Sequence, residues 1–533
     1  MFAYTLGNSS KLIAFNLKKD KLWLPSWMIT VIVFTVACAP LFPAVAGTPE
    51  EMAILAETMK NPVMIALCGP IYGDEYTYGI MYVQMMLVWV IMLIGVMNIF
   101  FIVRHTRRDE EDGKLEILQS LPIGRMSNLF SVTILSFIIN LITALLTGIG
   151  LSLLGIEGMD VSGCMLLGLA IGLCGLFFAA VTAIFAQLSS TAKGTSGLAI
   201  GLLAFFYLLR AAGDMRNESL SLFTPFGLAA KVQFFYKDNV WPLWILLAVS
   251  IVLFMVAFML NKTRDLGASL LPDSKGRKHA KKSLRGPLSL SMRLVKTTLI
   301  AWIVVIVVFA ASYGSVFEDL TSFYESNELF KSLMGLQGGS EDLTKSFLAT
   351  LMLIMSLIAV IPVLTIVFRL RSEEKKGRLE QVYANAVSKQ RNMLSYLGIA
   401  IATIIILQLL CALSMWATSH AVMKDPLDIS YFIKSAINFM PPMFFFAGLS
   451  VLLVGAFPKG TLIASIYLAI CFMLSYLGDV AGLPKWTANL SVFGVISHYP
   501  AESFEPLSAL VLIIIAAILA IAGIAAYQRR DIV

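Results

Sequence analysis

The chain alternates between long apolar stretches and short polar ones, a pattern that predicts a series of membrane-spanning helices. A helix needs about 20 consecutive apolar residues to cross the hydrocarbon core of a bilayer. Runs of this kind recur about twelve times, in two groups of six. We therefore expect an all-α integral membrane protein. The spans are expected near residues 27–46, 80–103, 129–154, 164–187, 196–212 and 243–261, and then near 298–316, 347–369, 394–417, 437–457, 461–477 and 507–527.

The composition supports this class. Of the 533 residues, 58% are hydrophobic and 14% are charged, whereas a soluble domain is typically about 45–50% apolar and about 25% charged. The formal net charge of +7 comes largely from lysines and arginines in short segments beside the apolar runs. That distribution indicates membrane topology rather than a nucleic-acid partner.

Lysine and arginine also indicate the orientation, because cytoplasmic loops are enriched in both. The start of the chain, the loop after the second predicted span and the linker 262–297 are basic, whereas the loop 156–163 carries two acids and no base. We expect both termini and the linker on the cytoplasmic side of the cell membrane, with the linker beside anionic lipid. The start of the chain shows no pattern of a cleavable signal peptide.

The two groups of spans repeat one another. The charged segment 107–125 aligns without a gap with 371–389, at an offset of 264 positions (377 − 113), and TRDLG (263–267) matches RRDIV (529–533). Agreement at several corresponding places indicates a duplication, and an even number of spans makes the two halves parallel. The expected domains are a first six-helix repeat (1–266), a basic cytoplasmic linker (267–292) and a second six-helix repeat (293–533).

Each charged segment predicts a short amphipathic helix. Leu379 and Val382 lie on one face of such a helix, as do Leu115 and Leu118 in the first half, where Pro122 is expected to end the helix. Acids precede the apolar stripe, where the positive end of the helix dipole favours them, and a glycine lets the chain turn. Either helix alone would suit the membrane surface, but two copies in register suit docking of a symmetric soluble partner.

These residues carry a resemblance to a known superfamily. The EExGRLE-type segment after the second span of each half resembles the permease subunits of type-2 ATP-binding-cassette exporters, and more narrowly the duplicated permeases of the polyketide-antibiotic (tetronasin-type) exporters. NPVMIALCGP (61–70), GD (213–214) and FTPFG (223–227) also match, with weaker copies at 478–479 and 493–494. The second half lacks a clear NPxxxxxxGP segment and has Val492 where the first half has Pro225.

The resemblance implies that 108–123 and 372–387 are coupling helices, each seated on an ATPase subunit. The chain has no GxxxxGK[ST] phosphate loop, so two copies of a separate ATPase would bind the ATP and Mg, and this chain would be a transport subunit rather than an enzyme. The expected docking residues are Glu110, Glu111, Gly113, Glu116, Leu118, Glu374, Gly377, Glu380 and Val382.

The resemblance also implies that the second and fifth spans of each half line the substrate path. Their methionines and aromatic residues could form an adaptable apolar surface for a hydrophobic or amphipathic compound, such as a polyketide ionophore; ordinary helix packing is the other interpretation. Arg210 and Asp214, at i and i+4 near the outer end of the fifth span, are expected to clamp an outer gate. The lining residues are Tyr82, Met85, Trp89, Phe206, Met352, Met355, Phe472 and Tyr476.

Two other classes fit less well. A major facilitator carrier also has twelve spans in two parallel halves, but RRDEEDGKLE does not match the G-x-x-x-D-R-x-G-R-R loop of such carriers. A membrane enzyme would need a catalytic pattern, and the four histidines fall in no HExxH or similar motif. The six cysteines form no CxxC pair, and a bridge between Cys68 and Cys164 is left open.

Overall fold

The computed structural model confirms the all-α class. It describes residues 6–531 except 46–47, 61, 74, 217, 266, 271–278, 280–283, 285, 318–338, 386, 424–425 and 478–484. Every regular element among the described residues is a helix, and eleven of these are long and apolar enough to cross a membrane. Half of the predicted linker and the second GD copy (478–479) lie outside the described residues.

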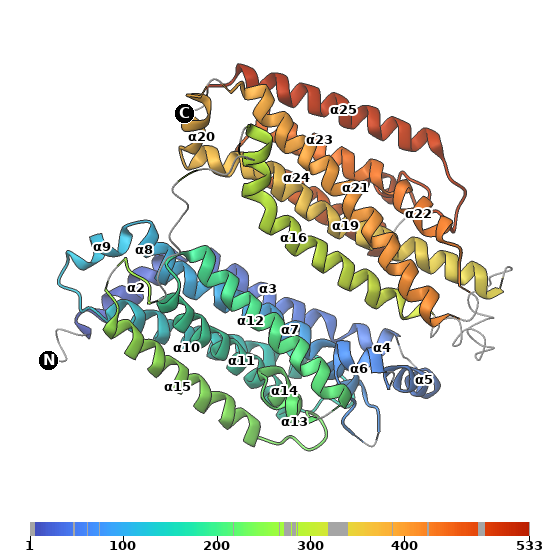
Figure 1. Ribbon diagram of the computed structural model, residues 1–533. Coiled ribbons are helices and arrows are strands. Elements are labelled where there is room, and N and C mark those ends of the chain that lie inside the picture. Colours follow the sequence, from blue (N-terminus) through green and yellow to red (C-terminus); the bar gives the residue numbers. More distant parts are fainter. Residues whose placement is uncertain are drawn as a thin grey trace. The chain divides into compact units, whose positions relative to one another are not determined.

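The chain forms two compact units, Met1–Gly276 and Arg277–Val533, which Figure 1 colours from blue to green and from yellow-green to red. The division falls within the predicted linker, and the duplication of the two halves stays a prediction.

The first unit has six spans and several short helices. Three short helices, α4, α5 and α6, precede the second span, and two more, α13 and α14, follow the fifth; the sequence pattern had not indicated them. The elements are α2 (Ser9–Lys19), α3 (Trp23–Cys38), α4 (Leu41–Val45), α5 (Pro49–Met59), α6 (Pro62–Cys68), α7 (Tyr78–Val103), a π-helical turn (Arg104–Arg108), α8 (Asp109–Glu111), α9 (Lys114–Gln119), α10 (Ser127–Leu153), α11 (Val161–Leu188), α12 (Ala192–Arg216), α13 (Glu218–Ser221), α14 (Pro225–Ala230) and α15 (Trp241–Thr263).

The second unit differs in two of its spans. The predicted span 437–457 is longer than expected and bends at Phe439, ahead of two prolines that begin α23. The predicted span 461–477 corresponds to a shorter apolar helix, α24, with a π-helical continuation. The elements are α16 (Pro287–Gly314), α19 (Gly339–Lys375), α20 (Arg378–Tyr383), α21 (Lys389–Val422), α22 (Ile429–Asn438), α23 (Met440–Ala456), α24 (Leu462–Phe472), a 3-10 turn (Lys485–Leu490) and α25 (Pro506–Arg529).

The same pairs of spans pack together in both units. In the first unit the contacting pairs are α3–α10, α7–α11, α7–α12 and α11–α15. In the second unit the pairs are α16–α21, α19–α23, α19–α24 and α23–α25. When these six apolar helices of each unit are numbered in chain order, the first contacts the third, the second contacts the fourth and the fifth, and the fourth contacts the sixth. The fourth span is therefore central to each unit, and 78% of the apolar window of α11 is buried.

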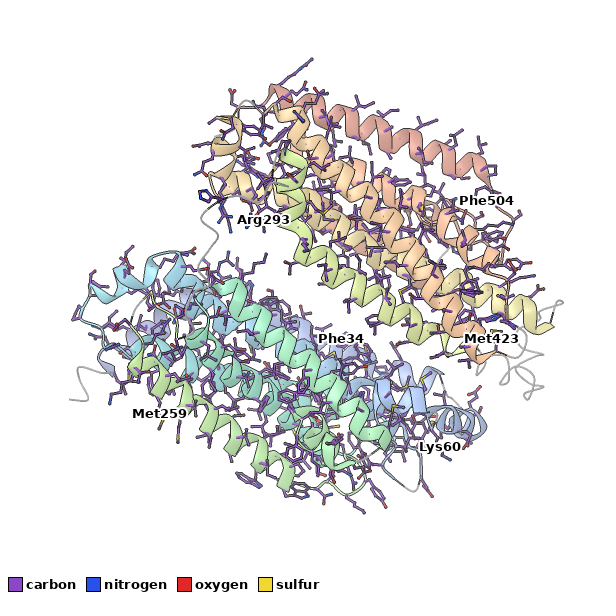
Figure 2. The ribbon with its side chains drawn as sticks, viewed as in Figure 1. Phe34, Lys60, Met259, Arg293, Met423 and Phe504 are labelled. Carbon is purple, nitrogen blue, oxygen red and sulfur yellow. The ribbon has the colours of Figure 1, made fainter. Side chains whose placement is uncertain are left out.

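The outward faces of the spans are apolar, as contact with lipid requires. Met259 on α15 is 68% exposed and Phe34 on α3 is 38% exposed, and Figure 2 labels both on the helices of the first unit. The basic residue Arg293 lies in the second unit at the end where α16 begins, and Met423 at the other end (Figure 2). All six cysteines are free, so Cys68 and Cys164 form no bridge.

Candidate functional site

The two charged segments share one backbone conformation. Gly113 and Gly377 both adopt the left-handed region, with φ of +69° and +66°, between the acidic residues and the next short helix. A Cβ atom at either position would meet nothing within 4 Å, so glycine is required there by the backbone angle rather than by a lack of space. The matched angles let each chain turn from the second span into a surface helix, α9 or α20.

The surface helices are amphipathic but shorter than predicted. Leu115 and Leu379 are buried against their units, whereas Glu116 and Glu380 are exposed. The predicted segments 108–123 and 372–387 contain only six helical residues each after the glycine. The first helix ends early because residues just before a proline avoid the α conformation.

The second surface helix, α20, ends because the next span begins shortly after it. The hydroxyl of Ser388 accepts a hydrogen bond from the Arg391 N–H at 3.2 Å and caps α21, so the chain must leave α20 in time to begin the next span. Leu118 and Val382, the other predicted stripe residues, are half-buried.

Glu110 is buried in an ion cluster rather than exposed for docking. Its carboxylate lies 3.0 Å from the Arg107 guanidinium and 2.9 Å from that of Arg264, just past the last span of the unit. It also accepts a hydrogen bond from the Gly267 N–H at 2.7 Å. Arg125, beyond α9, donates to the Arg264 carbonyl at 2.8 Å and closes the cluster.

The second unit has an equivalent cluster. The buried Glu374 carboxylate lies 2.7 Å from Arg371 and also pairs with Arg530, at the end of the last span. Lys389 donates to the Arg530 carbonyl at 2.7 Å, just as Arg125 donates to Arg264. We call these two groups the Glu110 cluster (Glu110, Arg107, Arg264, Arg125) and the Glu374 cluster (Glu374, Arg371, Arg530, Lys389).

The clusters change the interpretation of the predicted docking residues. Because the carboxylates of Glu110 and Glu374 are enclosed by arginines of their own unit, they hold the charged segment against the last span and present little surface to a partner. Glu111, Glu116 and Glu380 are exposed and remain available for docking, which stays a prediction. Burial of two carboxylates among several arginines is stable only while the pairing is complete.

The N-terminal helix α2 supports the first segment. Asp20, at the end of α2, lies 2.5 Å from the His105 ring and 2.9 Å from the Arg104 guanidinium. Burial would raise the pKa of Asp20, but the hydrogen bond and charge of His105 and the charge of Arg104 outweigh it and hold that pKa below its usual value. Lys19 pairs with Asp109 at 2.5 Å. Sequence analysis found no role for α2.

The second segment is attached through different side chains. The hydroxyls of Tyr383 in α20 and Tyr527 in α25 are hydrogen-bonded at 2.8 Å, and the Asn392 amide donates to Tyr383 at 3.1 Å. Glu373 pairs with Arg369 at 2.7 Å and with Arg378 at 3.2 Å. Both charged segments are therefore fixed to their units, each by its own set of side chains.

At the other end of the first unit, Arg210 joins the fifth span to α6. Its guanidinium lies 3.2 Å from Asp214, the pairing that the i, i+4 spacing indicates. It also donates to the carbonyls of Ala66 and Leu67, at 2.5 and 3.1 Å, which lie at the C-terminal end of α6, where a helix leaves carbonyls unpaired. The sequence could not show this second role, and the gating role stays a prediction.

The FTPFG motif forms a helix start beside this network. The Thr224 hydroxyl accepts a hydrogen bond from the Gly227 N–H at 3.0 Å, and Pro225 occupies the first turn of α14. In the second unit Ser491 caps the matching turn and its hydroxyl bonds that of Ser475 at 2.7 Å. Ser475 lies three residues before the second GD copy, as Arg210 does before the first. The ends of the two units opposite the charged segments are therefore not equivalent.

The predicted path residues fall into two groups. Tyr82, Met352 and Met355 are buried in the cores of their own units, and the Tyr82 hydroxyl donates to the Thr35 carbonyl at 2.7 Å. They could meet a substrate only if the unit rearranged. Trp89 and Phe472 are 38% and 37% exposed and lie at the surfaces of their units. Met85 and Phe206 are half-buried, and the Tyr476 side chain lies outside what the structure describes.

A surface groove of about 530 Å³ lies between α19 and α24, the second and fifth spans of the second unit. Its lining is almost entirely apolar, with Thr365 and Ser465 supplying two hydroxyls. Ligand pockets of about 300–1,000 Å³ with a few polar groups are typical of small-molecule sites. The apolar side chains include Ile358, Ile361, Phe368, Leu468 and Phe472.

Comparisons with known proteins agree on one family. The family model described as "Multidrug efflux system permease Rv1217c, C-terminal domain" matches residues 11–260 and 284–528, one stretch in each unit. The chain is also 30% identical, over 537 aligned residues, to the multidrug efflux system permease protein Rv1217c of Mycobacterium tuberculosis (strain ATCC 25618 / H37Rv). The alignment covers 100% of this chain and 96% of that protein.

Proposed function

Because the chain belongs to the family of multidrug efflux system permeases, we propose that it is the transmembrane subunit of an ATP-driven exporter. Two copies of a separate ATP-binding-cassette ATPase, which bind ATP and Mg, dock on the two charged segments 108–123 and 372–387, which we call the coupling segments. Both termini lie in the cytoplasm with those segments, and the narrower resemblance to tetronasin-type permeases is part of the proposal.

The matched Glu110 and Glu374 clusters carry this proposal. Each cluster joins the coupling segment to the end of the second span, through Arg107 or Arg371, and to the end of the last span, through Arg264 or Arg530. A push on a surface helix therefore moves two spans together rather than bending a loop. Nucleotide-driven closure of the ATPase copies supplies that push.

The transported compound is hydrophobic or amphipathic. The apolar groove between α19 and α24, with its two hydroxyls, suits a molecule that enters from the bilayer, and Phe472 lines it. Trp89 and Phe206 lie on the second and fifth spans of the first unit. Methionine and aromatic side chains adapt to varied ligands, in keeping with export of several compounds.

The docking experiment begins with affinity-tagged permease purified from its own cells. A co-purifying subunit that mass spectrometry identifies as an ATPase with a phosphate loop is the expected result. Reversing both exposed acids, Glu116→Lys with Glu380→Lys, should release that ATPase and abolish drug resistance while leaving membrane insertion intact. If resistance and ATPase association both survive the double reversal, the docking assignment is wrong.

The substrate experiment compares resistance across compounds. Trp89→Ala, Phe206→Ala and Phe472→Ala should each change resistance unevenly over a panel of hydrophobic ionophores, because apolar contacts are lost compound by compound. Hydrophilic drugs serve as the control panel. Resistance that persists when the ATPase carries an inactivated phosphate loop would contradict ATP-driven export and favour a secondary carrier.

A further inference from the structure

The two coupling segments share a backbone conformation but differ in their exposed side chains. Gly113 and Gly377 make the same left-handed turn, so positions 264 apart occupy equivalent places on α9 and α20. The exposed glutamates match. The position after each glutamate does not, because Ile117 is 70% exposed whereas Gln381 is exposed and polar.

The contrast continues one turn further on. Leu121 is 53% exposed, and its counterpart in register, Asn385, is exposed and bonded to the Gln381 carbonyl at 2.7 Å. The first segment thus presents two large apolar side chains at i and i+4, and the second presents two amides. These two exposed apolar side chains offer a partner an apolar contact that the second segment does not offer.

The face of the first segment is presented on a fixed support. The Asn8 amide donates to the Pro122 carbonyl at 2.7 Å, and the Gly124 N–H donates to the Gly7 carbonyl at 3.1 Å. The chain directly after Leu121 is therefore held to the start of α2. An apolar face held in place loses little conformational freedom when it binds.

We infer that the first coupling segment is the stronger anchor for the ATPase, through an apolar contact at Ile117 and Leu121 that the second segment lacks. This inference rests on the proposed function. The two ATPase copies are identical and present identical surfaces, so both can pair a basic side chain with Glu116 or Glu380. Only the copy on the first segment also buries Ile117 and Leu121, and it therefore dissociates more slowly.

The experiment uses full-length permease in lipid nanodiscs and the purified ATPase identified with the wild-type protein. Wild-type permease should bind two ATPase copies with affinities that differ by about tenfold or more, the effect of losing one or two buried apolar contacts. The double variant Ile117→Gln with Leu121→Asn gives the first segment the exposed amides of the second segment, and should leave two ATPase sites of equal, weak affinity. The reciprocal Gln381→Ile with Asn385→Leu should give two equal strong sites.

The outcomes separate this inference from the proposed function. Two equal sites in the wild type, or an unchanged strong site in Ile117→Gln with Leu121→Asn, would overturn the inference while leaving ATPase docking in place. No ATPase binding by the wild type would instead defeat the proposed function. Ile117→Gln with Leu121→Asn could instead leave both ATPase affinities unchanged and weaken only the binding of the first segment to lipid vesicles. In that case Ile117 and Leu121 contact lipid, and the inference fails.

A matched control is available at the same end of the first unit. Leu22, between α2 and α3, is also exposed but lies outside the coupling segment. Leu22→Gln should therefore leave both ATPase affinities unchanged. All these side chains are exposed, so each variant is expected to fold, and thermal unfolding of the permease checks that it does.

Discussion

At the scale of single residues, the buried carboxylates decide how the coupling segments are held. Glu110 and Glu374 each face two arginines of their own unit. A carboxylate in this position stabilises the fold because it compensates buried positive charge, and its removal leaves that charge unpaired. The exposed glutamates on the next helix, Glu116 and Glu380, compensate no buried charge. Substituting a buried and an exposed glutamate of the same segment therefore separates a structural role from a docking role.

Glu110→Gln should destabilise the permease by about 3–5 kcal/mol, the cost of breaking a buried ion pair from one side, and Glu374→Gln should act similarly in the second unit. Thermal unfolding of the purified permease measures the effect. Glu116→Gln is the control, because substitutions at exposed positions usually change the free energy of unfolding by less than about 0.5 kcal/mol. Equal stability of Glu110→Gln and wild type would show that the Glu110 cluster is not structural.

Gly113→Ala and Gly377→Ala should each cost about 1–2 kcal/mol, because a Cβ atom is unfavourable in the left-handed region. Asn tolerates that region better than other residues, so Gly113→Asn should retain most of the stability and most of the resistance. The same thermal unfolding measurement applies. An alanine variant as stable as the asparagine variant would argue against the left-handed turn.

At the scale of elements, the end of the fifth span makes different contacts in the two units. Arg210 caps α6 in the first unit, and the serine in the corresponding place, Ser475, bonds Ser491 instead. In the first unit, Arg210 therefore holds α6 over the end of the fifth span. That helix carries Cys68, a half-buried free cysteine, which reports on whether α6 stays in place.

Arg210→Ala should detach α6 and increase the labelling rate of Cys68 by a membrane-impermeant maleimide several-fold. Burial raises the pKa of the Cys68 thiol, and the Arg210 charge opposes that rise; release from burial makes the thiol more reactive. The measurement needs a Cys38→Ser background, since Cys38 is also half-buried. An unchanged labelling rate would mean that α6 is held by other contacts.

At the scale of the whole molecule, the described residues of the first unit form six candidate spans and those of the second form five with the shorter apolar helix α24, and each unit carries its charged segment at one end. In Figure 1, α8 and α9 lie at the same end of the first unit as α2, with α13 and α14 at the opposite end, and α20 lies beside the end of α25 in the second. Basic residues gather at the ends that hold these segments, so the positive-inside rule predicts that those ends face the cytoplasm.

Single cysteines at four exposed positions test this topology in intact cells that express a cysteine-free permease. Cysteines in place of Glu157 and Asp428 should react with a membrane-impermeant reagent from outside, whereas cysteines in place of Glu116 and Glu380 should react only after permeabilisation. Reaction of either coupling position from outside would reverse the orientation, and an ATPase could not dock there.

The sequence by itself determined the features that depend on local pattern. Apolar runs of sufficient length predicted the spans, because the thickness of the bilayer sets the length of a helix that crosses it. The repeated charged segments and their glycines were visible at a fixed offset, and the turn that Gly113 makes depends on its own backbone. The i, i+4 spacing was enough to pair Arg210 with Asp214, because helix geometry alone brings them together.

The tertiary structure decided which side chains are buried and which distant residues meet. Glu110 and Glu116 share one charged segment, yet only packing against Arg264, 154 positions away, buries the first and leaves the second exposed. Tyr82 and Trp89 both lie on α7, but neighbouring parts of the unit bury Tyr82 and leave Trp89 38% exposed. Burial depends on the helices that surround a residue, and no local pattern records those neighbours.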